Sequence, residues 1–75
     1  MPDSRQRLIR CFQAVFPDLT DADAPRASIH RVAAWDSVAQ VTLAAVVEEE
    51  FGFQFAVEEL EKLDSFDAFL SRLDR

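Results

Sequence analysis

Ser37 is the residue of this sequence that is best placed to do chemistry. It follows Asp36 in the run Trp35-Asp36-Ser37-Val38, ahead of a long apolar-rich segment, and such a pair is typical of a helix start. A hydroxyl at a helix N-terminus is exposed, and a phosphate ester formed on it would meet free backbone N–H groups and the positive end of the helix dipole. The pattern is therefore compatible with a plain helix cap and with an attachment point for a phosphate-linked group.

A catalytic role for Ser37 is disfavoured by its surroundings. A serine nucleophile needs a general base within hydrogen-bond reach and an oxyanion site, whereas the single histidine, His30, lies upstream in a loop-like segment. No Gly-x-Ser-x-Gly elbow surrounds the serine, and a core this small leaves little room for a substrate pocket. We therefore expect that the chain is not an enzyme, that a hydrolase is a distant alternative, and that His30 is a surface or loop-packing residue.

The sequence contains no recognisable metal site. Asp18, Asp21 and Asp23 form an acidic group, but the central Gly and the closing Glu of a calcium-binding EF-hand loop are missing. An Asx-rich turn is the better interpretation. The single cysteine, Cys11, excludes an intramolecular disulfide and a cysteine zinc site, and its place on an apolar stripe predicts a small buried core residue.

The composition indicates one domain, 1–75. Hydrophobic residues make up 49% of the 75 residues, which is enough for one compact core and too much for a disordered chain. The formal net charge of −6 without a basic cluster argues against a nucleic-acid partner and favours basic protein partners. The lone cysteine, the polar start of the chain and the lack of a long apolar run predict a cytoplasmic protein without a membrane partner. We expect it to be a monomer.

Hydrophobic spacing predicts a first helix over 4–16. Its apolar stripe consists of Leu8, Cys11, Phe12 and Val15. Asp3 or Ser4 can cap its start. Pro17 ends the helix, because the residue before a proline is driven out of the helical region.

The segment 18–34 is predicted to be a long loop with at most a short helical turn. It contains Pro25 and three aspartates, and loops of this length in small domains are often functional. We expect Ile29 and Val32 to pin this loop to the core.

Three further helices complete an all-α domain. Their predicted ranges are 37–51, 57–63 and 65–73. Asp36 or Ser37 can cap the second helix, Gly52 ends it, and Asp64 or Ser65 can cap the last. The residues expected to be buried together are Phe12, Leu43, Val47, Phe51, Phe69 and Leu73.

The second helix carries two stripes where a small helix needs only one apolar face. The stripe expected to pack on the core consists of Leu43, Ala44, Val47 and Phe51. The opposite stripe consists of Val38, Val41, Ala45 and Glu48. Spacing alone leaves open whether this second stripe lies under the long loop or is exposed for a partner. Glu48, Glu49 and Glu50 lie at the helix end that is unfavourable for anions, which is compatible with a functional acidic patch or a solvated face.

The pattern as a whole resembles the acyl carrier protein family. The matching positions are Asp36-Ser37-Val38, Val41, Leu43, Val47, Glu48-Glu49-Glu50-Phe51, Phe55, Glu58-Glu59 and Lys62-Leu63. The resemblance runs from Ser37 to Leu73 without a gap, and the segment before Ser37 has the family's usual length of one helix and a long loop. It implies a four-helix acyl-carrier-like bundle with three longer helices and one short third helix.

The resemblance implies that Ser37 carries a 4′-phosphopantetheine arm, added from coenzyme A by a phosphopantetheinyl transferase, with Asp36 beside the attachment point. The terminal thiol of the arm would hold acyl groups as thioesters and deliver them to acyl-loading and acyl-processing enzymes. The residues that it places on the face meeting the basic docking surfaces of these partners are Val38, Val41, Ala45, Glu48 and Glu49. On this resemblance the second stripe is exposed.

Several positions depart from the fatty-acid type of the family. Ala34 stands where Gly is usual before Asp-Ser, Trp35 is bulky, and His30-Arg31 are basic where acids are frequent. The Trp-Asp-Ser form is more similar to carriers of specialised pathways. We therefore expect an acyl carrier of a polyketide-like or fatty-acid-related pathway. The alternatives are an aminoacyl or peptidyl carrier and a non-carrier helical interaction module.

Overall fold

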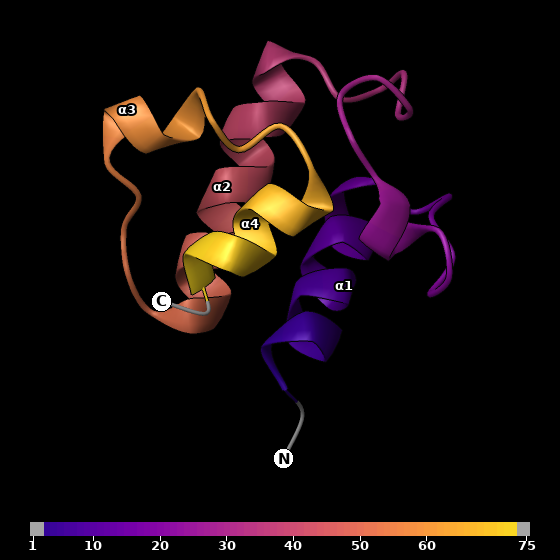
Figure 1. Ribbon diagram of the computed structural model, residues 1–75, viewed down its shortest axis with the longest axis horizontal. Coiled ribbons are helices and arrows are strands. Elements are labelled where there is room, and N and C mark those ends of the chain that lie inside the picture. The colour runs from indigo at the N-terminus through magenta and orange to yellow at the C-terminus, as the bar shows by residue number, and fades with distance from the viewer. Residues whose placement is uncertain (1–2, 74–75) are drawn as a thin grey trace.

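The computed structural model describes residues 3–73 as helices joined by loops (Figure 1). The helices are α1 (Ser4–Val15), α2 (Ser37–Phe51), α3 (Val57–Leu60) and α4 (Phe66–Leu73), and a 3-10 turn, η1 (Ala24–Arg26), lies in the long loop. Residues 3–73 contain no strand; Ser28 and Ser65 form only an isolated bridge. The all-α prediction is confirmed, and the first two and last two positions of the predicted domain lie outside the described residues.

Local capping contacts set the ends of the longer helices. Oδ1 of Asp3 accepts the N–H of Gln6 at 2.9 Å at the start of α1, and Oγ of Ser65 accepts the N–H of Ala68 at 3.1 Å at the start of α4. α2 ends at Gly52, whose φ of 73° is left-handed and is adopted by glycine without a steric penalty. The predicted ranges of α1, α2 and α4 are therefore confirmed to within one residue.

α3 is shorter than predicted, because it ends at Leu60 instead of at position 63. The next turn is held by the N–H of Lys62, which binds the carbonyl oxygen of Glu59 at 3.0 Å, and by the N–H of Leu63, which binds that of Leu60 at 3.3 Å. Such i→i+3 bonds tighten a terminal turn. The side-chain amide of Gln40 also donates to the Leu60 carbonyl, so α2 contacts the chain where α3 ends.

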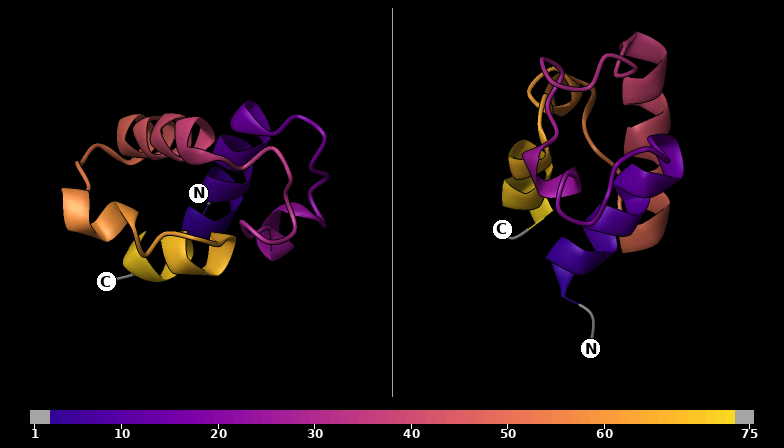
Figure 2. Two further views of the ribbon diagram at one scale, coloured as in Figure 1. Left: turned by 90° about the horizontal axis from the view of Figure 1, so that it is seen from above. Right: turned by 90° about the vertical axis from the view of Figure 1, so that its right-hand side faces the viewer.

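The three longer helices surround one core. α1 contacts both α2 and α4, and Figure 2 shows α2 and α4 on opposite sides of the molecule with α1 between them. The buried residues are Leu8, Cys11, Phe12, Phe16, Ala24, Ala27, Trp35, Leu43, Ala44, Val47, Phe55, Leu63, Phe66 and Phe69. No helix within residues 3–73 combines the length and the apolarity that crossing a membrane requires.

Aromatic rings dominate the centre of this core. The ring of Phe12 lies 5.5 Å from that of Trp35, 5.2 Å from that of Phe66 and 5.5 Å from that of Phe69, measured between ring centroids. These separations are in the range of favourable aromatic pairs. Phe12 thus joins α1 to α4 and to the residue that precedes the cap of α2.

The predicted core is confirmed at four of its six positions. Phe12, Leu43, Val47 and Phe69 are buried, whereas the prediction is wrong for Phe51 and Leu73, which are only half-buried. Each of these two is the last residue of its helix and packs against the edge of the core. The guanidinium of Arg7 lies 4.4 Å from the Phe51 ring centroid and covers part of it.

The long loop is anchored by residues other than those expected. Val32 is half-buried against the core, as predicted, but Ile29 is 43% exposed and the prediction for it is wrong. Ala24, Ala27 and Trp35 are buried in its place. The N–H of Ile29 binds the carbonyl of Asp64 at 3.0 Å, and the N–H of Phe66 binds that of Ala27 at 2.9 Å. The loop is therefore held by backbone pairing to the start of α4 as well as by small apolar side chains.

Cys11 is a buried core residue, as the sequence predicts. Burial, with a smaller contribution from the Glu50 carboxylate, raises the pKa of its thiol from 9.0 to about 11. Because the thiolate is the reactive form, the side chain stays protonated and unreactive at neutral pH. Its role is packing.

Candidate functional site

Ser37 is the first residue of α2, and its hydroxyl is not used to cap the helix. Oδ1 of Asp36 accepts the N–H of Ala39 at 2.8 Å, and the carbonyl of Asp36 accepts the N–H of Gln40 at 2.9 Å. Asp36 is therefore the N-cap, which decides between the two candidates that the sequence offered. The side chain of Ser37 is exposed and free for another role.

A side-chain network holds the start of α2 in place. Trp35 is buried, and its indole Nε1 donates to Oε1 of Gln40 at 2.6 Å. Nε2 of Gln40 donates to the carbonyls of Leu60 and Leu63 at 2.8 and 2.9 Å. This network joins the loop, α2 and the α3 turn. It thereby fixes the backbone on both sides of Asp36 and Ser37, which lie between Trp35 and Gln40. The sequence offered no signal for it, since Gln40 reads as an ordinary helical residue.

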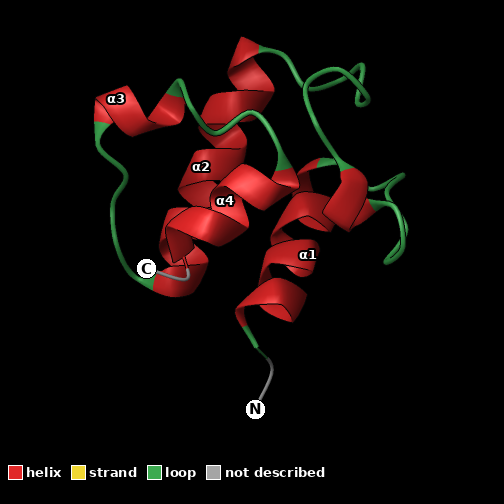
Figure 3. Cartoon of the chain, viewed as in Figure 1, coloured by secondary structure: helices red, strands yellow, loops and turns green. Residues whose placement is uncertain are grey.

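A groove of about 440 Å³ lies beside Ser37. It is lined by Ile29, Trp35, Asp36, Ser37, Gln40, Val41, Leu60, Glu61, Leu63 and Asp64. Figure 3 shows the start of α2 and α3 at the same end of the molecule, with the connection from α3 to α4 crossing in front of α2. Ser37 therefore stands at the edge of a cleft whose walls come from three separate parts of the chain.

The second stripe of α2 faces solvent. Val38 is 74% exposed, Val41 is 63% exposed, and Ala45 is exposed. The loop does not cover them, so the expected exposure is confirmed for these three residues, whereas Glu48, the fourth member of the stripe, is half-buried. Val57 at the start of α3 is also exposed, at 78%, and the sequence analysis did not single it out.

The three glutamates at the end of α2 have different surroundings. Oε2 of Glu48 accepts the N–H of Phe55 at 2.7 Å, and Glu48 is half-buried. Glu50 binds Arg7, with 2.8 Å between Arg7 Nε and Glu50 Oε2. Glu49 is exposed and makes no hydrogen bond or ion pair with another side chain in the described part of the chain. Structural contacts thus account for two of the acids at this end of the helix, which the sequence did not predict.

The role of Glu48 leads to a stability prediction. Glu48→Ala is expected to lower the free energy of unfolding by about 1–3 kcal/mol, because the part-buried Phe55 amide would lose its charged acceptor. Glu49→Ala, the matched control one residue away, is expected to change it by less than about 0.5 kcal/mol. Urea unfolding followed by circular dichroism measures both values. Equal midpoints for the two variants would show that the Glu48 contact does not stabilise the fold.

The other sequence candidates do not assemble into a second chemical site. His30 is exposed and does not line the groove beside Ser37. The carboxylate of Asp21 accepts the side-chain amide of Gln13 at 2.8 Å, which fits the interpretation of a structured turn. Within residues 3–73, no group of three or more His, Cys, Asp or Glu side chains lies close enough to hold a metal ion.

The site therefore consists of an exposed hydroxyl at a capped helix N-terminus, a groove beside it and an exposed apolar stripe below it. Three carboxylates, those of Asp36, Glu61 and Asp64, line the same groove, and His30 does not. No protein-family model matches this chain, and no match is found among curated proteins or solved structures.

Proposed function

We propose that this protein is an acyl carrier protein in which Ser37 bears a 4′-phosphopantetheine arm. The observation that carries the proposal is the exposed Ser37 hydroxyl, which Asp36 leaves free by capping α2 itself. A hydroxyl in this position is open to an incoming enzyme, and its modification does not disturb the cap. The bundle of three longer helices and the short α3 is then of the acyl-carrier type.

The residues around Ser37 fit a phosphate ester. The backbone N–H groups of Ser37 and Val38 precede the first hydrogen bond of α2, which the N–H of Gln40 makes. N–H groups at this place, together with the helix dipole, favour an attached anion. When bound, the arm would supply a terminal thiol that holds acyl groups as thioesters.

The groove gives an attached arm a surface to lie on. Ile29, Val41 and Leu60 supply apolar contact on its walls. The Trp35–Gln40 network joins two walls of the groove, α2 and α3, through hydrogen bonds. The chain's own residues thus orient and shelter the cargo, and the chemistry belongs to partner enzymes.

The exposed stripe and Glu49 form the proposed docking face. Val38, Val41 and Ala45 would supply close apolar contact, and Glu49 would attract a basic partner surface. The partners are a phosphopantetheinyl transferase and acyl-loading and acyl-processing enzymes of a polyketide-like or fatty-acid-related pathway. We propose that the carrier acts as a cytoplasmic monomer.

Modification by a transferase tests the proposal. The wild-type chain is incubated with coenzyme A and a broad-specificity phosphopantetheinyl transferase, and its intact mass is measured. One added phosphopantetheine group is expected. An unmodified chain, with a known carrier fully modified in the same tube, would rule out the carrier function in favour of a non-carrier module. If the chain is modified, competition between acyl and aminoacyl groups for loading onto the arm separates an acyl carrier from an aminoacyl or peptidyl carrier.

Two substitutions test the docking face. Val41→Asp and Glu49→Lys are each expected to slow arm transfer about tenfold, because they remove apolar contact and steering respectively. Stability should stay within about 0.5 kcal/mol, since both side chains are exposed. The Glu49→Lys effect should shrink with added salt. Asp18→Lys makes the same charge change away from α2 and is expected to leave the rate unchanged; a loss as large as that of Glu49→Lys would mean that only net charge matters.

A further inference from the structure

Arg26 and Arg31 differ from most of the other arginines of the described chain. Arg7 and Arg72 form ion pairs with Glu50 and Glu59, and Arg5 lies over a phenylalanine ring. Arg26 and Arg31 are exposed and make no ion pair or ring contact with residues 3–73. These two arginines share one cleft, and neither forms an ion pair with Asp23, which also lines it.

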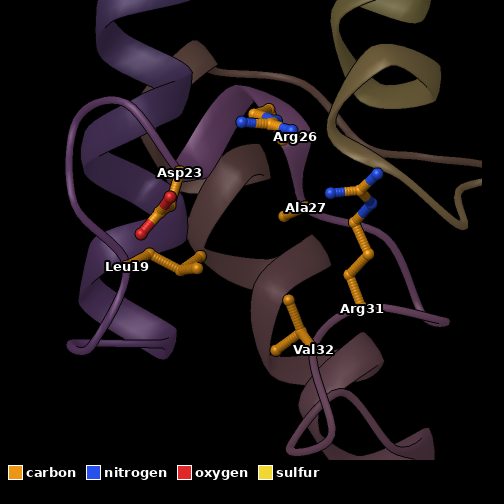
Figure 4. A pocket seen from close by; sticks show the side chains of 6 residues that line it. All are labelled: Leu19, Asp23, Arg26, Ala27, Arg31 and Val32. Atoms are coloured by element: carbon orange, nitrogen blue, oxygen red, sulfur yellow. The ribbon is translucent and has the colours of Figure 1, made fainter.

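The cleft that they share lies in the long loop and has a volume of about 300 Å³. Its lining residues are Leu19, Asp23, Arg26, Ala27, Arg31 and Val32. Figure 4 shows Arg26 and Arg31 at the top and right of the cleft, Leu19 and Asp23 at its left, and Val32 below. Ala27 is buried, and Leu19 and Val32 are half-buried, so the cleft combines a charged rim with an apolar floor.

Backbone hydrogen bonds hold both arginines on ordered turns. The N–H of Arg26 binds the carbonyl of Asp23 at 2.9 Å. The N–H groups of Arg31 and Val32 both bind the carbonyl of Ser28, at 3.0 and 2.9 Å. A ligand that binds here therefore does not have to order the loop first, which lowers the cost of binding.

We propose that this cleft binds a carboxylate that carries a short apolar chain. The guanidinium fork matches the two oxygens of a carboxylate, and the floor formed by Leu19, Ala27 and Val32 would bury the chain. Asp23 reduces the charge of the lining to +1, from two arginines and one aspartate, which one carboxylate neutralises. The apolar floor gives a strongly hydrated dianion such as phosphate no compensation for the water that it would lose. The volume is at the lower end for ligand sites and suits a group of a few carbon atoms.

Two sources can supply this chemistry, namely a free organic acid and a glutamate side chain of a partner protein. The site is separate from the proposed attachment site, since the cleft and the groove beside Ser37 share no lining residue. The inference does not rest on the carrier function, and it can be tested on the unmodified chain.

Titration of the ¹⁵N-labelled full chain, followed by amide NMR shifts at constant ionic strength, tests the site. The probes are butyrate, N-acetylglutamate methylamide, inorganic phosphate and butylammonium. Saturable shifts with butyrate are expected at the amides of Ala27, Arg31 and Val32, with much weaker responses to phosphate and butylammonium. Tighter binding of butyrate would identify a free acid as the ligand, and tighter binding of the glutamate derivative would identify a side chain.

Charge-neutral variants locate the binding. Arg26→Gln and Arg31→Gln are each expected to weaken butyrate binding about tenfold or more, because a charged hydrogen-bond donor is lost. Arg10→Gln removes the same charge from an exposed arginine of α1 outside the cleft and is expected to bind like the wild type. Unchanged amide shifts elsewhere verify that each variant is folded. Non-saturating shifts, equal binding of phosphate, or wild-type affinity in the Arg26 and Arg31 variants would overturn the proposal.

Discussion

Ser37→Ala is expected to abolish the addition of phosphopantetheine while leaving the fold nearly unchanged. The hydroxyl oxygen is the proposed attachment atom, so no product can form without it. Asp36 remains as the N-cap, and alanine is a good helix former. Intact mass after the transferase reaction measures the first effect, and thermal unfolding measures the second.

Asp36→Ala is the matched control for this prediction. It keeps the hydroxyl but removes the cap, and the expected cost is about 1 kcal/mol of stability. The two adjacent substitutions should therefore separate attachment from capping. A mass increase that persists in Ser37→Ala would place the attachment on another residue. A loss of stability in Ser37→Ala as large as in Asp36→Ala would show that the serine also caps the helix.

Phe69→Ala is expected to lower the free energy of unfolding by about 3–5 kcal/mol. The ring is fully buried and lies within 5.5 to 6.4 Å of the rings of Phe12, Trp35 and Phe55, between centroids. A domain of this length has a total stability of only about 4–11 kcal/mol, so the variant is expected to be largely or partly unfolded. Urea unfolding with the single tryptophan as fluorescent reporter measures the loss.

Phe51→Ala provides the comparison within the same residue type. Phe51 is half-buried at the end of α2, under the Arg7 guanidinium, and truncation there should cost clearly less than at Phe69. The sequence pattern alone predicts the same cost at both positions. Equal losses would show that the edge of the core is as well packed as its centre.

The start and end of α1, α2 and α4 could be predicted from the sequence because their causes are local. Asp3, Asp36 and Ser65 cap helices through bonds that span three residues, and Gly52 needs only its own backbone freedom. The core face of α2 followed from the spacing of Leu43 and Val47 for the same reason. Such interactions depend on neighbours along the chain, which the sequence lists in order.

The contacts that the sequence left undecided join distant segments. Gln40 donates to carbonyls some twenty residues away in the α3 turn, and Glu48 accepts the amide of Phe55 only because the chain reverses at Gly52. Ile29 is apolar and was expected to pack on the core. Its backbone pairs with Asp64 instead, and its side chain is partly exposed. None of these partners can be identified from a spacing rule.

For the candidate site, the sequence by itself determined which residue starts the helix, and the tertiary structure decided its surroundings. An Asp-Ser pair before an apolar helix is sufficient to predict a hydroxyl at a helix start, because capping is a local property. Whether Val38 and Val41 are exposed, and where the groove lies, depended on the path of the long loop. The shared cleft of Arg26 and Arg31 likewise exists only because η1 and the turn after Ser28 fold toward one another. Burial and clefts are properties of how segments pack, and packing depends on all of the elements at once.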